Sequence, residues 1–374
     1  MKQILSRIFR IITVLFFLYI FFVSISLMSH AFKGFGSGFA ERLITTTSNP
    51  FVGLFIGILA TSIIQSSGTT TSMVVVFVAS GVLSVRCAIP IIMGANIGTT
   101  VTCTLVALGH ITRKEEFKRA FSGSIMHDLF NILTVIILFP IEMATHYLEK
   151  AGIFLASIFN NMGGAAITSP IKFIVKPAVN AIDDLLRNHL CVSNVALNII
   201  ILIIALALLF MSLYNISRVM RSLVMKKADI VFDKVIRKTA ILAMFMGMLF
   251  TAIVRSSSIT TSILVPLVAA GILQLEHSFP IVLGANVGTT ITAMLAALTG
   301  NIAGITIAFV HLVFNLTGIL IIYPLKRLRR IPIVVARFIA EKCTERRILA
   351  IIYVLGVFYA LPVGLILLSR FFKK

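Results

Sequence analysis

Gln65-Ser66-Ser67-Gly68-Thr69-Thr70-Thr71-Ser72 decides the fold, because a second stretch of the chain repeats it. The repeat is Arg255-Ser256-Ser257-Ser258-Ile259-Thr260-Thr261-Ser262, which begins 255 − 65 = 190 residues later. The same offset, without a gap, aligns Gly94-Ala95-Asn96-Ile97-Gly98-Thr99-Thr100 with Gly284-Ala285-Asn286-Val287-Gly288-Thr289-Thr290. Roughly half of the aligned pairs between residues 51 and 108 and their counterparts are identical, so the chain is an internal duplication.

The composition predicts an integral membrane protein. Of the 374 residues 59% are apolar, and the mean hydropathy is +1.06, more than a soluble core of this size can bury. Several apolar runs reach the length of about twenty residues that crosses about 30 Å of hydrocarbon. They are Ile8 to Met28, Asn194 to Tyr214, Ala303 to Pro324 and Ile348 to Leu368. The first run is longer than a signal peptide requires, so we interpret it as a retained span.

The net charge of +20 is distributed as in membrane proteins. Basic residues gather in short segments beside apolar runs, which indicates cytoplasmic loops rather than a nucleic-acid partner. These segments are 2–10, 113–119, 218–238 and 326–330. The pattern predicts a cytoplasmic N-terminus. The absence of large soluble loops, together with four cysteines that form no plausible disulfide pairs, favours a bacterial inner membrane. The oligomeric state is left open.

The expected fold is an all-α polytopic membrane protein built from two inverted-topology repeats, each with a re-entrant helical hairpin and a broken transmembrane helix. Residues 1–145 hold a first span and the first repeat, with a hairpin at 51–85, a broken helix at 88–108 and a helix at 125–141. Residues 146–193 are an external linker. Residues 194–325 form the second repeat, with a hairpin at 241–275, a broken helix at 279–299 and a helix at 303–324. A basic segment and a final span fill 326–374.

The hairpins are predicted from length. Phe51 to Ile64 and Met73 to Val85 are apolar but too short to cross a bilayer, and they flank the polar Gln65 motif. The broken helices are predicted from Gly, Asn and Thr inside otherwise apolar runs. Three spans in the first copy would give the second copy the opposite orientation, which is the plan of secondary transporters that bind substrate where broken elements meet.

The repeated polar residues suit a site for an oxyanion and a cation. Hydroxyl groups both donate and accept hydrogen bonds, and broken helices present positive N-terminal ends and unpaired carbonyls. The expected oxyanion contacts include Thr70, Asn96, Thr260 and Asn286. The alternative is structural, because Ser and Thr often bond within their own helix and Gly permits close helix packing.

Ionisable residues within apolar segments are further candidates, because burying them in a membrane is costly. Asp128 has no acidic counterpart in the second copy, which suits an asymmetric cation site. His127 and His311 are interpreted as hydrogen-bonding residues that pack helices. Arg255 occupies the position of Gln65, and two interpretations stay open: it binds an oxyanion, or its side chain extends to the cytoplasmic surface.

These motifs together resemble the type II sodium/phosphate cotransporter family. The resemblance covers residues 51–140 and 240–324 and rests on the two apex motifs, the two Gly-Ala-Asn-x-Gly-Thr-Thr segments and His127-Asp128-Leu129-Phe130-Asn131. It implies symport of inorganic phosphate with Na⁺, with no other cofactor. It further implies that Ser66, Ser67, Ser256, Ser257 and Ser258 contact phosphate and Na⁺, and that Asp128, Asn131, Thr289 and Thr292 serve Na⁺. From their places at the two apices, we add Arg255 to the expected phosphate contacts and Gln65 to the expected Na⁺ contacts.

The chain departs from the family pattern around the implied site. Arg255 stands where the second apex of the family has Gln, Gly68 replaces a Ser, and Ala285 replaces another Ser. His110 and Arg113 occupy positions of a Gln and an Asp. We hypothesise that Arg255, together with His110, supplies positive charge that a sodium ion supplies in relatives.

The sequence therefore predicts a phosphate transporter that works by alternating access and is coupled to Na⁺. A phosphate exporter and a carrier for another oxyanion remain alternatives, as does a channel. A membrane phosphoester hydrolase is disfavoured, because no carboxylate pair, metal-ligand cluster or nucleophile with a neighbouring base has suitable spacing.

Overall fold

The computed structural model describes residues 2–190, 192–236 and 239–371, and the regular structure within these ranges is helical. The helices are α1 (Lys2–Gly34), α2 (Ser37–Thr47), α3 (Pro50–Ile64), α4 (Ser67–Ala79), α5 (Val85–Gly98), α6 (Val101–Leu108), α7 (Lys114–Thr145), α8 (Tyr147–Phe159), η1 (Asn160–Gly164), α9 (Ala165–His189), α10 (Asn194–Ile236), α11 (Ala240–Val254), α12 (Ser257–Ala269), α13 (Leu275–Ala297), α14 (Ile302–Ile322), α15 (Lys326–Glu345), α16 (Ile348–Leu355), η2 (Gly356–Ala360) and α17 (Leu361–Phe371). The expected all-α class is confirmed.

Seven helices among the described residues are long and apolar enough to cross a membrane. They cover Ile8–Gly34, Val85–Leu108, Lys114–Thr145, Asn194–Arg221, Leu275–Ala297, Ile302–Ile322 and Ile348–Ser369. The apolar run at the C-terminal end becomes one span made of α16, η2 and α17. The chain is an integral membrane protein, as its composition predicts.

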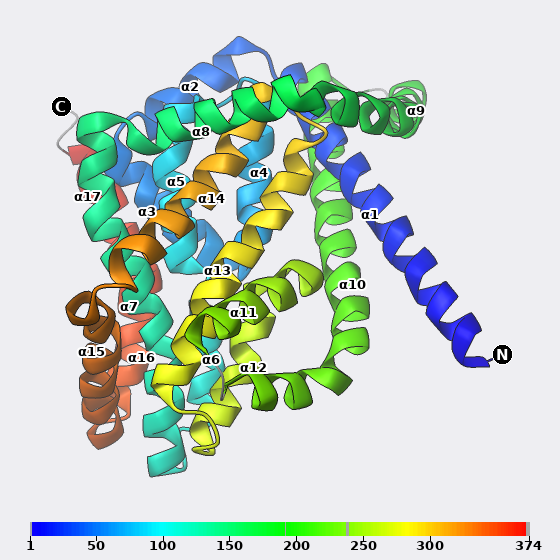
Figure 1. Ribbon diagram of the computed structural model, residues 1–374. Helices are drawn as coiled ribbons and strands as arrows, with labels where there is room; N and C mark the ends of the chain where they lie inside the picture. Colours follow the sequence, from blue (N-terminus) through cyan, green and yellow to red (C-terminus); the bar gives the residue numbers. More distant parts are fainter. Residues whose placement is uncertain (1, 191, 237–238, 372–374) are drawn as a thin grey trace.

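The helical bundle has two opposite end faces. Helix α1 begins near one of them, and α17 ends near the other (Figure 1). Helices α2, α8 and α9 lie across the face at which α17 ends, which we call the α9 face. The expected linker 146–193 supplies α8 and α9 to this face. The stretch after Lys33, expected to be a polar connection, forms most of α2, and α2 meets α3 at an angle of 99°.

Both expected hairpins consist of two short helices. Helices α3 and α4 form hairpin 1 with 15 and 13 residues, and α11 and α12 form hairpin 2 with the same lengths. At 1.5 Å per residue such helices are only about 20 Å long, less than the thickness of the hydrocarbon layer. Helix α4 lies in the half of the bundle towards the α9 face and α12 in the other half (Figure 1). The inverted relation of the copies remains a prediction.

The glycines at equivalent positions of the two copies allow helices to pack closely. A Cβ atom on Gly57 of α3 would overlap the carbonyl oxygen of Ile91 in α5, and one on Gly247 of α11 would overlap that of Ile281 in α13. Gly94 and Gly284 face their partner helices in the same way. Each hairpin is therefore held against the following helix by backbone contact, which larger residues would prevent.

One of the two expected helix breaks is absent. In the first copy, α5 ends at Gly98 and α6 begins at Val101, so the break expected within 88–108 is a short interruption at Thr99 and Thr100 inside one span, Val85–Leu108. In the second copy, α13 continues unbroken from Leu275 to Ala297, contrary to the break expected within 279–299. Gly284 and Gly288 meet the backbone of α11, as Gly94 and Gly98 meet that of α3, so these glycines serve packing in both copies and do not by themselves interrupt a helix.

Candidate functional site

The apex of each hairpin is a single tight turn with the same backbone geometry. Gln65 and Arg255 have left-handed conformations, with φ of 57° and 59°, and their N–H groups donate to Thr61 and Thr251 respectively. Non-glycine residues in this conformation cost about 1–3 kcal/mol and persist only where the surroundings enforce them. The two apices are thus strained turns with the same backbone conformation.

A serine caps the second helix of each hairpin. The Ser66 hydroxyl accepts a hydrogen bond from the Thr69 N–H at 3.2 Å, and the Ser256 hydroxyl accepts one from the Ile259 N–H at 3.3 Å. The Thr69 hydroxyl also donates to Ser66 at 2.8 Å. Helices α4 and α12 therefore begin at the apices, where their macrodipoles place partial positive charge.

The two apices meet at one cavity of about 240 Å³, which we call the apex cavity. Hairpin 1, hairpin 2, α10 and α13 all contribute to its wall. Its lining residues are Ile64, Ser66, Gly68, Thr69, Phe210, Leu213, Tyr214, Ser217, Arg255, Ser256, Ile259 and Thr292. Both capping serines line the cavity, so the starts of two helices converge on it.

Arg255 contributes a buried cation to the apex cavity. Only 8% of the surface of this residue is exposed. Its side-chain atoms Nε, Nη1 and Nη2 have no hydrogen-bond partner among the described residues. The guanidinium carbon lies 4.7 Å from the centre of the Phe21 ring. This burial disfavours the interpretation in which the side chain extends to the membrane surface. A buried guanidinium without acceptors is costly, and an oxyanion in the cavity would satisfy it.

Five other expected phosphate residues, Ser67, Thr70, Ser257, Ser258 and Thr260, do not line the apex cavity. Ser67 is buried and accepts a hydrogen bond from the Thr99 hydroxyl at 3.0 Å. Thr70 donates to the Ser66 carbonyl at 3.2 Å, and Thr260 lies 2.6 Å from the Thr251 hydroxyl. Ser257 is buried and Ser258 half-buried, and neither belongs to the residues that line the cavity.

Asn96 and Asn286 belong to a buried polar cluster between helices instead of the cavity wall. His127 Nε2 lies 2.7 Å from Oδ1 of Asn286, whose Nδ2 donates to Oδ1 of Asn131 at 2.7 Å. Asn131 donates in turn to the Asn96 carbonyl at 2.6 Å, and His311 Nε2 lies 3.4 Å from Oδ1 of Asn96. These five residues form the polar cluster. Both histidines act in it as packing residues, in line with expectation.

The expected sodium residues are spread over several places. Asp128 is fully buried and accepts a hydrogen bond from the Tyr353 hydroxyl at 3.1 Å, while its Oδ1 has no partner among the described residues. Asn131 already uses its Oδ1 within the polar cluster, and Thr289 donates to the Ala285 carbonyl of its own helix. Gln65 is exposed at its apex.

Thr292 is the expected sodium residue that reaches the apex cavity. Its hydroxyl is buried, has no partner among the described residues and lines the cavity. Its methyl group would lie 3.3 Å from a Cβ atom placed on Gly68. The glycine at position 68, where the resembling family has a serine, therefore leaves room for Thr292 on the opposite wall.

His110 and Arg113 do not take part in the apex cavity. His110 Nδ1 lies 3.4 Å from Oε2 of Glu116, and Arg113 Nη1 lies 3.0 Å from Oε1 of the same carboxylate. Both side chains thus contact the carboxylate of Glu116 in the first turn of α7. The hypothesis that His110 supplies charge to the substrate is contradicted by this pairing, and the hypothesis now concerns Arg255 alone.

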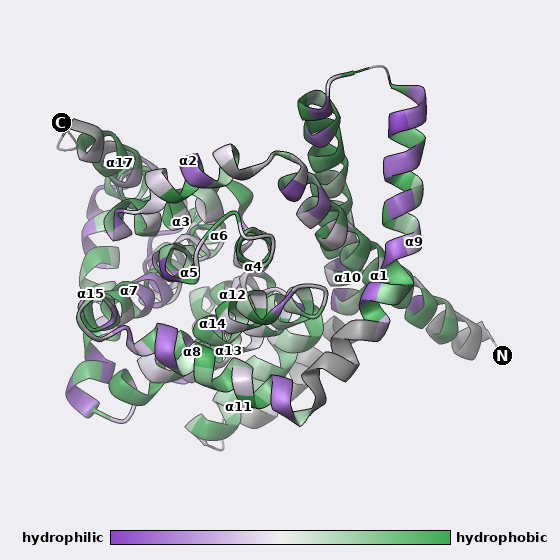
Figure 2. Ribbon diagram, turned by 90° about the horizontal axis from the view of Figure 1, so that it is seen from above, coloured by the Kyte–Doolittle hydropathy of each residue, from purple (hydrophilic) through white to green (hydrophobic). Residues whose placement is uncertain are grey.

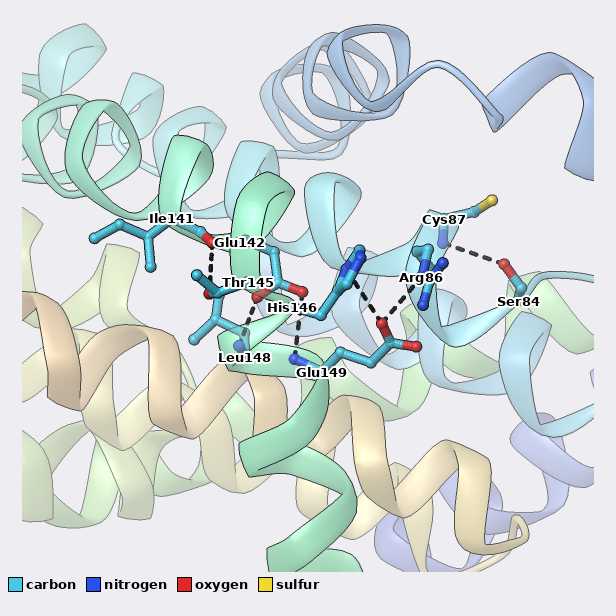
Figure 3. A network of polar contacts seen from close by, with 9 residues as sticks. All are labelled: Ser84, Arg86, Cys87, Ile141, Glu142, Thr145, His146, Leu148 and Glu149. Carbon is cyan, nitrogen blue, oxygen red and sulfur yellow. Dashed lines mark hydrogen bonds and ion pairs between the residues drawn. The ribbon is translucent and has the colours of Figure 1, made fainter.

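A group of three possible metal ligands lies at the corner between α7 and α8. Glu142, His146 and Glu149 have ligand atoms within 4.8 Å of one another (Figure 3). However, Glu142 accepts hydrogen bonds from the backbone N–H groups of Leu148 and Glu149, and Glu149 is paired with Arg86 at 3.1 Å. The group therefore fixes the corner, and its carboxylates are already engaged.

Sequence reasoning missed several residues around the site. Helix α10 supplies Phe210, Leu213, Tyr214 and Ser217 to the cavity wall, and Phe21 of α1 covers Arg255. These residues lie in ordinary apolar runs outside the duplicated segments. Tyr353 beside Asp128 lies in the final span, and nothing in its local sequence marks it. A Tyr or Ser inside an apolar run is a weak signal that could have raised Tyr214 and Ser217 as candidates.

The fold and the site define a polytopic helical membrane protein in which two hairpins of duplicated sequence line one cavity that contains a buried arginine. A family model described as Na⁺/Pi-cotransporter matches residues 20–164 and 196–358. Because this match covers most of the chain, the protein belongs to that family.

Several relatives are similar over nearly the whole chain. Sodium-dependent phosphate transport protein 2B of Pongo abelii is 33% identical over 96% of this chain and 65% of the relative. Protein 2A of Rattus norvegicus is 33% identical over 97% of this chain and 68% of the relative. Protein 2A of Ovis aries is 35% identical, over 92% and 65%. The chain thus spans about two thirds of the length of these relatives. No solved structure matches it.

Proposed function

We propose that this protein is a secondary active transporter that moves inorganic phosphate together with Na⁺. The observation that carries the proposal is the buried guanidinium of Arg255, which has no acceptor among the described residues and lines the apex cavity. The names of the relatives, which describe sodium-dependent phosphate transport, support the choice of phosphate among oxyanions.

The apex cavity has the chemistry that phosphate binding requires. Arg255 would donate to two phosphate oxygens in a fork that a lysine cannot reproduce. The N-terminal ends of α4 and α12 add partial positive charge from two directions. The capping hydroxyls of Ser66 and Ser256 lie in the same wall and can turn to the ligand. The apolar side chains of α10 would exclude water and strengthen these interactions.

The two hairpins suggest how access to this cavity alternates. Each apex contributes to the wall, and the copies of the sequence that carry them are expected to have opposite orientations in the membrane. Movement of hairpin 1 against α5 would open the cavity to one side, and movement of hairpin 2 against α13 would open it to the other. The close glycine contacts favour sliding of whole helices over bending within them.

Sodium would bind near the cavity at hydroxyl and carboxylate oxygens. Thr292 offers an uncommitted hydroxyl in the cavity wall, and Asp128 offers an uncommitted Oδ1 beside Tyr353. Hard cations prefer such oxygen ligands. Because Asp128 has no acidic counterpart in the second copy, a sodium site at this residue would be asymmetric.

We place the protein in a bacterial inner membrane with its N-terminus in the cytoplasm, on the basis of the charge distribution. The direction of transport and the identity of the oxyanion are the points on which alternatives differ. An exporter would release phosphate from vesicles in which phosphate is loaded into the compartment that faces the start of α1. A carrier for another oxyanion would lose phosphate uptake to an excess of sulfate.

The test is uptake of labelled phosphate by proteoliposomes that contain the purified full chain. An inward Na⁺ gradient should drive accumulation above the equilibrium level, and replacing Na⁺ by K⁺ should remove it. A tenfold excess of sulfate, which corresponds to about 1.4 kcal/mol of binding free energy, should leave phosphate uptake largely unchanged. Equal uptake in Na⁺ and K⁺ would refute sodium coupling, and no uptake under either gradient would refute phosphate transport.

A further inference from the structure

A second concave site lies on the α9 face, away from the apex cavity. It has a volume of about 400 Å³ and is formed by the end of α1, the end of α4, α9 and the connection between α13 and α14. We call it the α9 basin. Its lining residues are Ser26, Ser29, His30, Lys33, Ala79, Lys172, Lys176, Val179, Asn180, Thr299, Gly300 and Asn301.

The α9 basin is strongly cationic. Lys33, Lys172 and Lys176 line it from two different helices, and no Asp or Glu is among the lining residues. The carboxylate of Asp183 lies 3.5 Å from the lining residue His30 and is also paired with Arg187 at 2.9 Å. Hydrophilic residues recur along α9 (Figure 2). A concave surface with charge of one sign focuses its field on ions of the opposite sign.

A helix start adds to the positive potential of the basin. Helix α14 begins at Ile302, directly after the lining residue Asn301. The Asn301 side chain accepts from the Gly304 N–H at 3.2 Å and donates to the Ala79 carbonyl at 3.0 Å. Asn301 thus joins the start of α14 to the end of α4. The Thr299 hydroxyl and the Gly300 N–H donate to carbonyls of α13, so the loop adds to the basin the partial positive charge of the α14 start, and the lysine ammonium groups supply the free donors.

Helices connect the basin with the apex cavity. Helix α4 contributes Thr69 to the cavity near its start and Ala79 to the basin at its end, a rise of about 15 Å. Thr292 of α13 lines the cavity, and Thr299, seven residues later, lines the basin, about 10 Å further on. The two sites are therefore separate, but they are close enough for the positive electrostatic potential of the basin to reach the apex cavity.

We propose that the α9 basin is a second oxyanion site, which binds a phosphate group through Lys33, Lys172 and Lys176. The phosphate group belongs either to inorganic phosphate or to the head group of an anionic lipid. As a site for inorganic phosphate the basin deepens the proposed function, on which this role rests: it collects the substrate on the α9 face and raises its local concentration next to hairpin 1.

Direct binding tests the basin without relying on transport. The full chain carrying Arg255→Gln, which weakens the apex cavity, is placed in neutral phosphatidylcholine nanodiscs, and binding of labelled phosphate is measured at low salt. Adding Lys172→Gln and Lys176→Gln should weaken the remaining binding by about three- to tenfold. Adding Lys150→Gln and Arg86→Gln, which remove the same charge outside the basin, should not. Equal loss in both sets, or no loss in either, would overturn the proposal.

Anionic nanodiscs separate the two sources of the phosphate group. With phosphatidylglycerol in the nanodisc, a lipid-occupied basin would exclude labelled phosphate, and native mass spectrometry would detect a retained lipid that the double lysine variant loses. Both results support the basin and assign it to the lipid. If phosphate binding persists in phosphatidylglycerol, the basin serves inorganic phosphate. Failure of sodium-driven uptake would refute the transport function and leave these binding results unaffected.

For an inorganic phosphate site, flux supplies an independent readout. In proteoliposomes at low ionic strength, the double lysine variant should raise the KM for phosphate by about threefold with kcat unchanged. The difference in KM between the variant and the wild type should vanish at 0.5 M salt, where the Debye screening length falls to about 4 Å. A change in kcat, or a KM effect that high salt leaves intact, would contradict a collecting role.

Discussion

His127 Nε2 lies 2.7 Å from Oδ1 of Asn286, so the last long helix of the first copy is bonded to the Gly-Ala-Asn segment of the second. The reverse contact also exists, because His311 of the second copy lies 3.4 Å from Asn96 of the first. The two copies are thus joined by exchanged histidine–asparagine pairs. Asn131 bridges the pairs through Asn286 and the Asn96 carbonyl, which makes the polar cluster one continuous network.

Replacing Asn286 by Leu should destabilise the protein substantially. The change leaves His127 and Asn131 buried without their shared partner, and each such group costs about 1–3 kcal/mol. Thermal unfolding of the purified protein in detergent measures the loss. Asn215→Leu is the control, because Asn215 bonds only the Met211 carbonyl of its own helix. A variant at position 286 that unfolds at the wild-type temperature would show that the network contributes no stability.

Gly57→Ala and Gly247→Ala should each disrupt one hairpin. The added methyl group would overlap the Ile91 or the Ile281 carbonyl, so the helices must separate, at a cost of about 1–3 kcal/mol. The yield of monodisperse protein in size-exclusion chromatography and the unfolding temperature report the effect. Gly364→Ala, in the final span, meets nothing within 4 Å and should be harmless. Similar behaviour of all three variants would contradict the close-packing account.

Tyr353→Phe should weaken the dependence of uptake on Na⁺. The hydroxyl donates to Asp128 at 3.1 Å, and this bond orients the carboxylate that we assign to sodium. Losing a hydrogen bond to a charged group costs about 1.5–3 kcal/mol of binding free energy. The half-saturating Na⁺ concentration should therefore rise about tenfold or more. Tyr359→Phe, which loses a bond to the Ser62 carbonyl, is the matched control in the same span. An unchanged Na⁺ response in Tyr353→Phe would remove Asp128 from the sodium site.

Glu142→Ala should loosen the corner between α7 and α8. The carboxylate accepts the N–H groups of Leu148 and Glu149, and its loss leaves these buried donors unpaired, at about 1–3 kcal/mol each. Hydrogen exchange of the first turn of α8 should accelerate. Chelators should have no effect on the wild type, because the corner carboxylates are occupied by protein donors. Stabilisation by added divalent cation would instead show that the corner is a metal site.

The sequence predicted those features that depend on duplication and chain length. The two apices and their hairpins follow from paired motifs flanked by apolar runs too short to cross, and the break near Thr99 follows from its Gly and Thr residues. The same residue types misled for α13, where Gly284 and Gly288 serve packing against α11. Glycine spacing alone does not distinguish a helix break from a helix contact, because both need a missing side chain.

Long-range contacts in the site could not be predicted. The expected sodium residue Thr292 reaches the apex cavity, whereas Asn131 is engaged in the polar cluster, and only the packing of separate helices decides this difference. Phe21 covers Arg255 across more than two hundred positions of sequence. No local pattern reports such a contact. The burial of Arg255, which the sequence left undecided, is fixed by helices that lie outside the duplicated motifs.

The central claim is that Arg255 binds the transported oxyanion, and phosphate affinity measures it most directly. Binding of labelled phosphate to the purified chain in saturating Na⁺ should weaken by about ten- to a hundredfold in Arg255→Gln, because this variant loses charge-assisted hydrogen bonds to phosphate. Arg255→Lys should retain part of the affinity, and the exposed Arg86→Gln should retain all of it. Wild-type affinity in Arg255→Gln would contradict the account.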